Sequence, residues 1–211
     1  VRSTTTPNAP FNADIALALN VIDTDNVAFA SNPVAFGTAT AGNGIAFNSG
    51  KLMRFGRLAI RNSNGSQLVS LPVPMETQYW NGTVFVTNDG DNCTTIATNN
   101  PAMSNFTTNL VACETANTAV SAFNKGRSTL TLAAPGSANN GSVDLAVNLT
   151  AANSGTTCTT VGGGTVPAAG ANRTYLQGNW TGGAYNVNPS ARATFGVYKG
   201  AEEIIFVREN F

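Results

Sequence analysis

Three cysteines are the residues of this 211-residue chain with the most definite chemistry. They are Cys93, Cys113 and Cys158, and an odd number leaves at least one thiol without a partner in the chain. Cys93 and Cys113 are 20 residues apart, a loop that a disulfide would stabilise by about 3 kcal/mol through restriction of the unfolded chain. We therefore expect a Cys93–Cys113 disulfide, with Cys158 as a free thiol or an intermolecular link. Three reduced, inert thiols are the alternative.

The chain contains no histidine, and this removes several kinds of catalysis. Without imidazole there is no Ser-His-Asp or Cys-His relay and no histidine metal ligand. Glu202, Glu203 and Glu209 remain as carboxylates for glycoside cleavage. Nothing around Glu203 and Glu209 indicates the burial that raises a carboxyl pKa, and we interpret them as solvated strand charges that discourage edge pairing. We expect a protein that is not an enzyme, with no catalytic residues and no cofactor.

Two loops are rich in oxygen ligands of the kind that calcium prefers. They are Asp23–Asn26 and Asn88–Asn92, and the second contains Asp89 and Asp91. Neither has the full spacing of a calcium-binding loop with its closing glutamate. Asp and Asn also bond to their own backbone in Asx turns. We favour that interpretation, so Asp89 and Asp91 are weak calcium candidates and no metal is expected.

Four aromatic residues could form a surface that stacks on sugar rings. Tyr79 and Trp80 are adjacent, whereas Trp180 and Tyr185 lie in a glycine-rich segment that suits a loop. Core packing accounts for most large aromatics in β-sandwiches and is the preferred interpretation. Trp180 and Tyr185 are therefore alternative ligand-binding residues.

The charge composition restricts the choice of partners. Charged residues make up 10% of the chain and the net charge is zero. Such a chain has no long-range field to attract nucleic acid or anionic lipid. Near-zero net charge also permits self-association, because subunits do not repel one another. We expect the chain to bind other copies of itself or other surface proteins, and no nucleic acid.

No apolar run approaches the ~20 residues that a membrane helix requires, so we expect no membrane-spanning segment. The chain has no initiator methionine, and residues 1–10 are polar and threonine-rich. These features are typical of a processed product or a piece of a longer, exported precursor. We also expect residues 1–10 to be held in place by a neighbouring chain.

The elements that must position these residues are strands, because apolar residues recur with a period of two. The clearest runs are Ile15–Val21, Val143–Leu149, Leu130–Leu132 and Ala193–Val197, and further expected strands are 56–61, 67–71, 76–80, 83–87 and 203–208. Asn64-Gly65 and Asn81-Gly82 are typical of hairpin turns. Residues 109–123 could hold one short helix.

This pattern predicts an all-β, antiparallel β-sandwich, Ig-like or jelly-roll-like, with little helix. Two lobes, residues 1–75 and 76–211, would meet near Pro72–Pro74, or the chain forms one continuous domain.

Several motifs together resemble one known family. They occur at Met53–Leu58, Asn64–Ser66, Leu71–Pro74, Gln78–Gly82, Phe85–Asn88, Asp91–Thr94, Asn188–Gly196 and Ile204–Phe211. In order and spacing they resemble the C-terminal region of MshQ-type proteins, associated with mannose-sensitive haemagglutinin type IV pili of Gram-negative bacteria. The closing motif is the most specific part. The chain departs from the pattern by lacking a long upstream portion, by ending in Phe211 where Tyr is common, and by carrying Cys158 in a variable region.

The resemblance implies an exported, β-rich protein at the surface of a Gram-negative bacterium, and it provides no catalytic residues. Ile204, Ile205, Phe206 and Val207 form a continuous apolar run. Such a run suits a strand that is buried on both faces, in this fold or in a neighbouring subunit. We therefore regard it as a candidate assembly strand. We therefore expect a non-enzymatic subunit of a self-associating filament, sheath or pilus-like assembly. The alternative is an adhesin module that binds a glycan or another surface ligand.

Overall fold

The computed structural model describes residues 2–13, 18–30, 32, 34–35, 39–40, 44–45 and 51–196. Over these ranges the protein is all-β, as the alternation predicts, with one 3-10 turn, η1, at Thr174–Leu176. The chain separates into two compact units. We call Val1–Thr6, Gly56–Tyr79 and Val86–Phe211 the sandwich unit, and Pro7–Phe55 with Trp80–Phe85 the hairpin unit.

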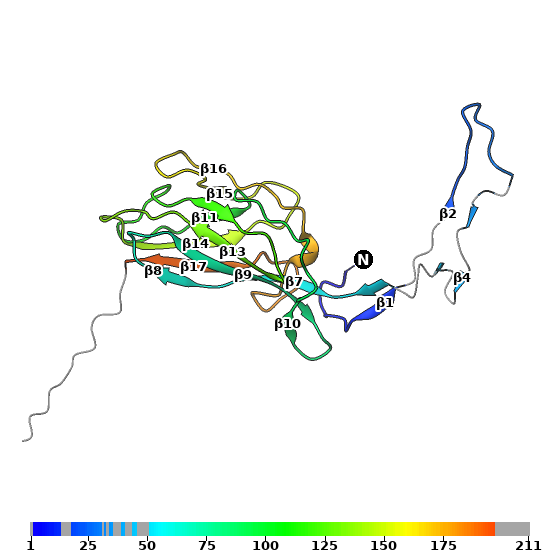
Figure 1. Cartoon of the computed structure of the whole chain (residues 1–211), viewed down its shortest axis with the longest axis horizontal. Helices are drawn as coiled ribbons and strands as arrows, with labels where there is room; N and C mark the ends of the chain where they lie inside the picture. The colour runs from blue at the N-terminus through cyan, green and yellow to red at the C-terminus, as the bar shows by residue number, and fades with distance from the viewer. Residues whose placement is uncertain are drawn as a thin grey trace, which may run out of the picture. The chain divides into compact units, whose positions relative to one another are not determined.

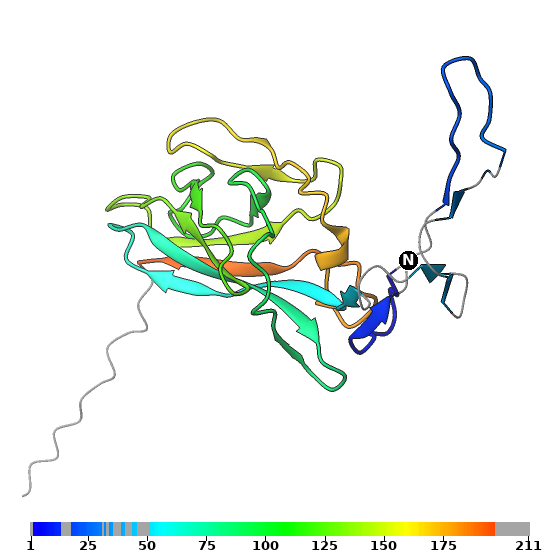
Figure 2. The ribbon, with the colours of Figure 1, turned by 45° about the vertical axis from the view of Figure 1, so that its right-hand side comes forward.

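A five-stranded sheet forms one layer of the sandwich (Figures 1 and 2). Its strands are β7 (Gly56–Ile60), β9 (Leu71–Trp80), β10 (Phe85–Thr87), β12 (Asn117–Val120) and β13 (Arg127–Leu132). The long strand β9 pairs antiparallel with both β7 and β13. Side chains of β7 and β13 therefore lie beside those of β9 on opposite edges of this strand.

A four-stranded sheet in the order β11-β14-β17-β8 forms the other layer. Its strands are β8 (Ser63–Gly65), β11 (Pro101–Ser104), β14 (Gly141–Val147) and β17 (Ser190–Phe195). β14 pairs antiparallel with β11 and β17, and β8 pairs parallel with β17. In the same unit β15 (Thr156–Thr157) and β16 (Val166–Pro167) form a small ladder.

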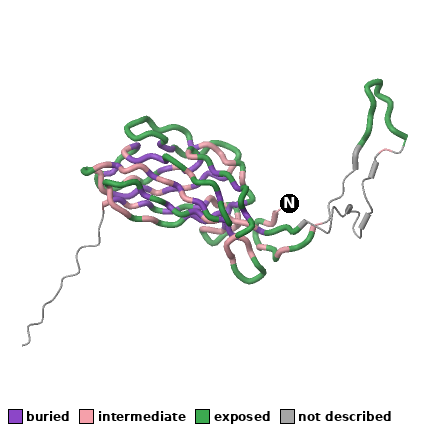
Figure 3. Tube along the Cα trace, viewed as in Figure 1, coloured by how far each residue is buried: buried purple, intermediate pink, exposed green. Residues whose placement is uncertain are grey.

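The hydrophobic core takes its residues from both sheets, and buried positions concentrate in the sandwich unit (Figure 3). Alternate residues of β9, β13, β14 and β17 are buried, which is the period-two pattern of strands with one face in a core. Val73 and Leu130 from one sheet and Leu145 and Phe195 from the other are fully buried. This confirms the expected β-sandwich.

One disulfide joins Cys113 to Cys158, and the expected Cys93–Cys113 pairing is wrong. Two backbone hydrogen bonds bring the correct partners together, from Asn117 N to Cys158 O at 2.8 Å and from Gly162 N to Cys113 O at 2.8 Å. Both bonded cysteines are buried in the core. Cys158 is therefore neither a free thiol nor an intermolecular link, and the free, exposed cysteine is Cys93.

Several expected local structures also differ. Residues 63–65 form β8 rather than a hairpin turn, because they pair with β17 from far along the chain. Residues 117–120 are strand β12 within the segment where a short helix was expected. The boundary expected between residues 75 and 76 falls inside β9, whose pairing with β7 and β13 continues across it.

The hairpin unit contains three small antiparallel ladders. They pair β1 (Phe11–Ala13) with β6 (Lys51–Met53), β2 (Ala18–Leu19) with β3 (Val34–Ala35), and β4 (Ala39–Thr40) with β5 (Gly44–Ile45). Asn81-Gly82 forms the expected turn in this unit, where Asn81 N donates to Val84 O at 3.0 Å. Phe85 packs against Trp80 with ring centroids 5.2 Å apart.

No helix in the described part of the chain is long and apolar enough to span a lipid bilayer.

Candidate functional site

A row of charged and polar side chains crosses the outward face of the five-stranded sheet. The strand register builds it, because Glu76 of β9 lies opposite Ala59 of β7 on one side and Arg127 of β13 on the other. Arg57 lies opposite Gln78 in the same way. Residues two apart share a face of a strand, so Glu76 and Gln78 point away from the core that contains Met75.

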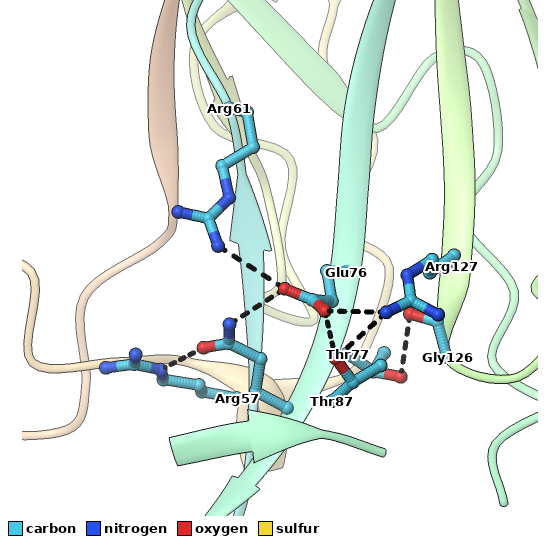
Figure 4. A network of polar contacts seen from close by, with 8 residues as sticks. Arg57, Arg61, Glu76, Thr77, Thr87, Gly126 and Arg127 are labelled. Atoms are coloured by element: carbon cyan, nitrogen blue, oxygen red, sulfur yellow. Dashed lines mark hydrogen bonds and ion pairs between the residues drawn. The ribbon is translucent and has the colours of Figure 1, made fainter. Parts of the chain in front are cut away.

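Glu76 is the centre of this network (Figure 4). Its carboxylate accepts hydrogen bonds from Thr87 Oγ1 and from Gln78 Nε2, the latter at 2.9 Å, and its Oε2 lies 3.4 Å from Arg61 Nη2. Burial raises the pKa of Glu76, whereas the hydrogen bonds from Thr87, Gln78 and Arg61 lower it. Together these hydrogen bonds outweigh burial, so the pKa is below the ordinary glutamate value. Glu76 is therefore ionised at neutral pH and is unsuited to act as a general acid.

Gln78 extends the row to Trp180. Arg57 Nε donates to Gln78 Oε1 at 2.8 Å, and the Arg57 guanidinium lies over the Trp180 ring, 4.7 Å from its centroid. A guanidinium over an indole face is a favourable cation–π contact. The candidate sugar-binding residue Trp180 thus packs on a charged side chain of its own domain.

Arg2 makes the corresponding contact with Tyr185 and fixes the first residues of the chain. Its guanidinium lies 5.8 Å from the Tyr185 ring centroid and donates to the carbonyl oxygens of Tyr185, Gly56 and Gln177 at 2.8, 2.9 and 2.8 Å. Tyr185 N also donates to Thr4 O at 2.6 Å. The expectation that a neighbouring chain holds residues 1–10 is unnecessary for Arg2 and Thr4, since their own domain binds them.

An open hollow of about 530 Å³ lies beside Glu76 on the outward face. The arginines Arg61 and Arg127 line it together with Glu76. The remaining lining residues are Pro74, Met75, Ser121, Ala122, Asn124, Ser128 and Thr129.

Asp23 and Asp91 each form an Asx turn in the two oxygen-rich loops. Asp91 accepts from Thr94 N at 3.0 Å and from Thr94 Oγ1 at 2.6 Å, and Asp23 Oδ1 accepts from Asp25 N at 2.9 Å. Both carboxylates are therefore used by their own backbone. No cluster of three metal-ligating His, Cys, Asp or Glu side chains occurs in the ranges that the structure describes.

Some predicted site residues lie outside the described residues. These are the assembly strand Ile204–Val207 and the carboxylates Glu202, Glu203 and Glu209. The described candidates Trp180 and Tyr185 each pack on a different arginine, Arg57 and Arg2.

Arg61, Glu76 and Arg127 were missed as site residues. No short motif joins them, because they gather only through the pairing of β7, β9 and β13. The available signal was compositional, since Arg61 and Glu76 lie in predicted strands and Arg127 lies shortly before one, in a chain of which only 10% is charged.

The outward face combines an ionised carboxylate with exposed arginines. Its carboxylate is ionised and hydrogen-bonded, and its cations are arginines, which do not exchange protons near neutral pH. Forked guanidinium groups beside hydroxyl side chains are suited to recognising anionic, oxygen-rich ligands.

Comparison with known proteins yields one family. Residues 54–210, well over half of the chain, match the family described as DUF6701, fourth domain. No curated protein and no solved structure matches the chain.

Proposed function

The chain belongs to the DUF6701 family, and we propose that it is a non-enzymatic structural module of a self-associating assembly at the bacterial cell surface. In finer detail, it would be one domain of an MshQ-type, pilus-associated exported protein. The numbering of the matched region as a fourth domain supports a place among several modules.

The observation that carries this proposal is the number of exposed apolar side chains in the hairpin unit. Phe11 and Met53 lie directly opposite each other in the β1–β6 ladder, and both are about half exposed, at 52% and 48%. Six further exposed apolar residues in the described part of the unit are Val21, Ile22, Val27, Phe29, Leu52 and Val84. Single exposed apolar residues are ordinary, but a group of them in one small unit is typical of a contact surface.

We assign this surface to a second copy of the chain. The net charge is zero, so two copies do not repel each other. A short two-stranded ladder is at most marginally stable in water, and association would bury its apolar side chains. Strand addition to β1 or β6 is the simplest geometry, because main-chain hydrogen bonds would extend the ladder.

The disulfide supports a location outside the cytoplasm. Structural disulfides persist in oxidising compartments and are rare where glutathione and thioredoxin keep thiols reduced. Cys113 and Cys158 are both buried, so their bond serves the fold rather than a reactive site.

The oligomeric state tests the proposal. Light scattering coupled to size-exclusion chromatography should give a mass for the purified chain that rises with concentration. The double substitution Phe11→Ser and Met53→Ser should shift the protein to monomer, because it removes apolar area from the contact.

The matched control is Val161→Ser, which removes an apolar side chain of similar exposure, 47%, from a loop of the sandwich unit. It should assemble like the parent protein. A parent that stays monomeric at every concentration, or a double variant that assembles unchanged, would contradict the proposal.

A further inference from the structure

Arg61 and Arg127 line the same hollow, and among the described residues their guanidinium groups make only long contacts, which for Arg127 include Thr87 Oγ1 at 3.4 Å. Their side chains are 61% and 68% exposed, and both approach Glu76 from opposite sides. The contacts are long, at 3.4 Å from Arg61 Nη2 to Oε2 and 4.0 Å from Arg127 Nη2 to Oε1. Charge-assisted N–H···O bonds are normally about 2.7–2.9 Å.

The other sheet provides a comparison within the same protein. Arg192 donates to the two oxygens of Asp144 at 2.7 and 3.0 Å, which is the fork geometry of a satisfied pair. Neither arginine forms such a fork with Glu76, whose two oxygens accept from Thr87 and Gln78. Arg61 and Arg127 therefore lie beside Glu76 and keep N–H groups that can donate to a ligand.

The remaining lining of the hollow combines hydroxyl and amide side chains with the apolar residues Pro74, Met75 and Ala122. Ser121 Oγ lies 3.2 Å from Ser128 Oγ and accepts from Thr129 N at 2.9 Å, so these side chains are held in place by their strands. The hollow also contains Asn124 and the ring of Pro74. Its volume of about 530 Å³ lies within the range of small-ligand sites, roughly 300–1,000 Å³.

We propose that this hollow binds the carboxylate-bearing sugar units of an acidic polysaccharide. Two guanidinium groups and one carboxylate leave a net charge of +1, which favours an anion. A uronic acid presents one carboxylate and several hydroxyls on a compact ring, and this matches forked cations beside hydroxyl and amide side chains. Nucleic acid is a poorer match, because no aromatic residue lines the hollow on which a base could stack.

This site goes beyond the proposed function, because assembly through the hairpin unit requires no ligand here. The test is an NMR titration of the full chain with trigalacturonic acid, using maltotriose as the neutral sugar and triglutamate as the acidic peptide. Trigalacturonic acid should shift the backbone amides of Asn124, Ser128 and Thr129. The apparent affinity should weaken as salt rises, since an exposed ion pair is screened.

Arg61→Gln and Arg127→Gln should each weaken binding of trigalacturonic acid about tenfold, which is the loss of one hydrogen bond to a charged group. Arg127→Lys should recover part of the loss, because it keeps the charge and not the fork. Arg173→Gln is the matched control, since Arg173 lies outside the hollow. Thermal unfolding of each variant shows whether it is folded.

Three outcomes would overturn the proposal: no binding of trigalacturonic acid, equal binding by the Arg61→Gln/Arg127→Gln double variant, or equally tight binding of triglutamate. Each is independent of the oligomeric state, so failure of this site and failure of the assembly proposal are distinguishable.

Discussion

Asp91 shows how one carboxylate can stabilise a whole loop. It is buried, and it accepts from the side chain and backbone of Thr94 and from Cys93 N. Burial raises the pKa of Asp91, whereas these hydrogen bonds and one from Thr77 lower it. The hydrogen bonds outweigh burial, so the pKa is below the ordinary aspartate value. The ionised form therefore stabilises the folded state.

The stability of the protein should depend on pH through this residue. A carboxyl pKa that is lower in the folded state contributes stability above the unfolded pKa and loses it as pH falls through the folded pKa. The free energy of unfolding should thus fall as pH drops below the ordinary aspartate pKa of about 4. Asp91→Asn should destabilise the protein at pH 7 by about 1–3 kcal/mol and flatten this fall, as measured by urea denaturation across pH.

The exposed neighbour Asp89 provides the control, and Asp89→Asn should follow the parent curve. A steep acid loss that is unchanged in Asp91→Asn would show that other carboxylates are responsible. Glu76 and Asp144 are the other described carboxylates whose pKa is lowered.

At the scale of elements, local patterns predicted the long strands well and their long-range partners poorly, and the expected strand 67–71 is a turn that leads into β9. Alternation in Val143–Leu149 and Leu130–Leu132 predicted β14 and β13. A strand with one buried face has apolar residues at every second position, which a short stretch of sequence is enough to reveal. The Asn64-Gly65 turn was wrong because pairing with β17, about 130 residues away, decides the conformation there. Arg61, Glu76 and Arg127 were missed for the same reason, since only the strand register brings them together.

The disulfide was mispredicted because loop length alone was used to choose the partner. The bond that forms closes a loop of 45 residues, and in the chain-entropy view a loop of that length contributes about 4 kcal/mol. Replacing both Cys113 and Cys158 by alanine should lower the free energy of unfolding by roughly this amount. Urea denaturation with and without reductant measures it, since reductant should destabilise the parent and leave the variant unaffected.

Cys93→Ser is the control for this experiment, because Cys93 is free and exposed. It should unfold like the parent, and its sensitivity to reductant should remain. If the Cys93→Ser variant no longer responded to reductant, Cys93 would be part of the disulfide, and the result would contradict the Cys113–Cys158 bond.

At the scale of the whole molecule, the two units differ in how their apolar residues are used. The sandwich unit buries its large side chains between two sheets and is closed by a disulfide. The hairpin unit leaves Val21, Ile22, Val27 and Phe29 exposed, and the hairpin that contains them is closed by the Asp23 turn and the bond from Phe29 N to Val21 O at 2.9 Å. Local hydrogen bonds thus shape this hairpin, and its exposed apolar side chains are available for the contact that we propose between copies.

Hydrogen exchange should distinguish these two units. Amides of β14 and β17 should exchange slowly at any concentration, because they lie in paired strands with buried side chains. Amides of residues 11–13, 21–29 and 51–53 should exchange quickly in dilute protein and become protected as assembly proceeds. The Phe11→Ser/Met53→Ser variant should lose the concentration-dependent protection and keep the slow exchange of β14. Protection that rises instead in the sandwich unit would place the contact between copies there and would remove the hairpin unit from the interface.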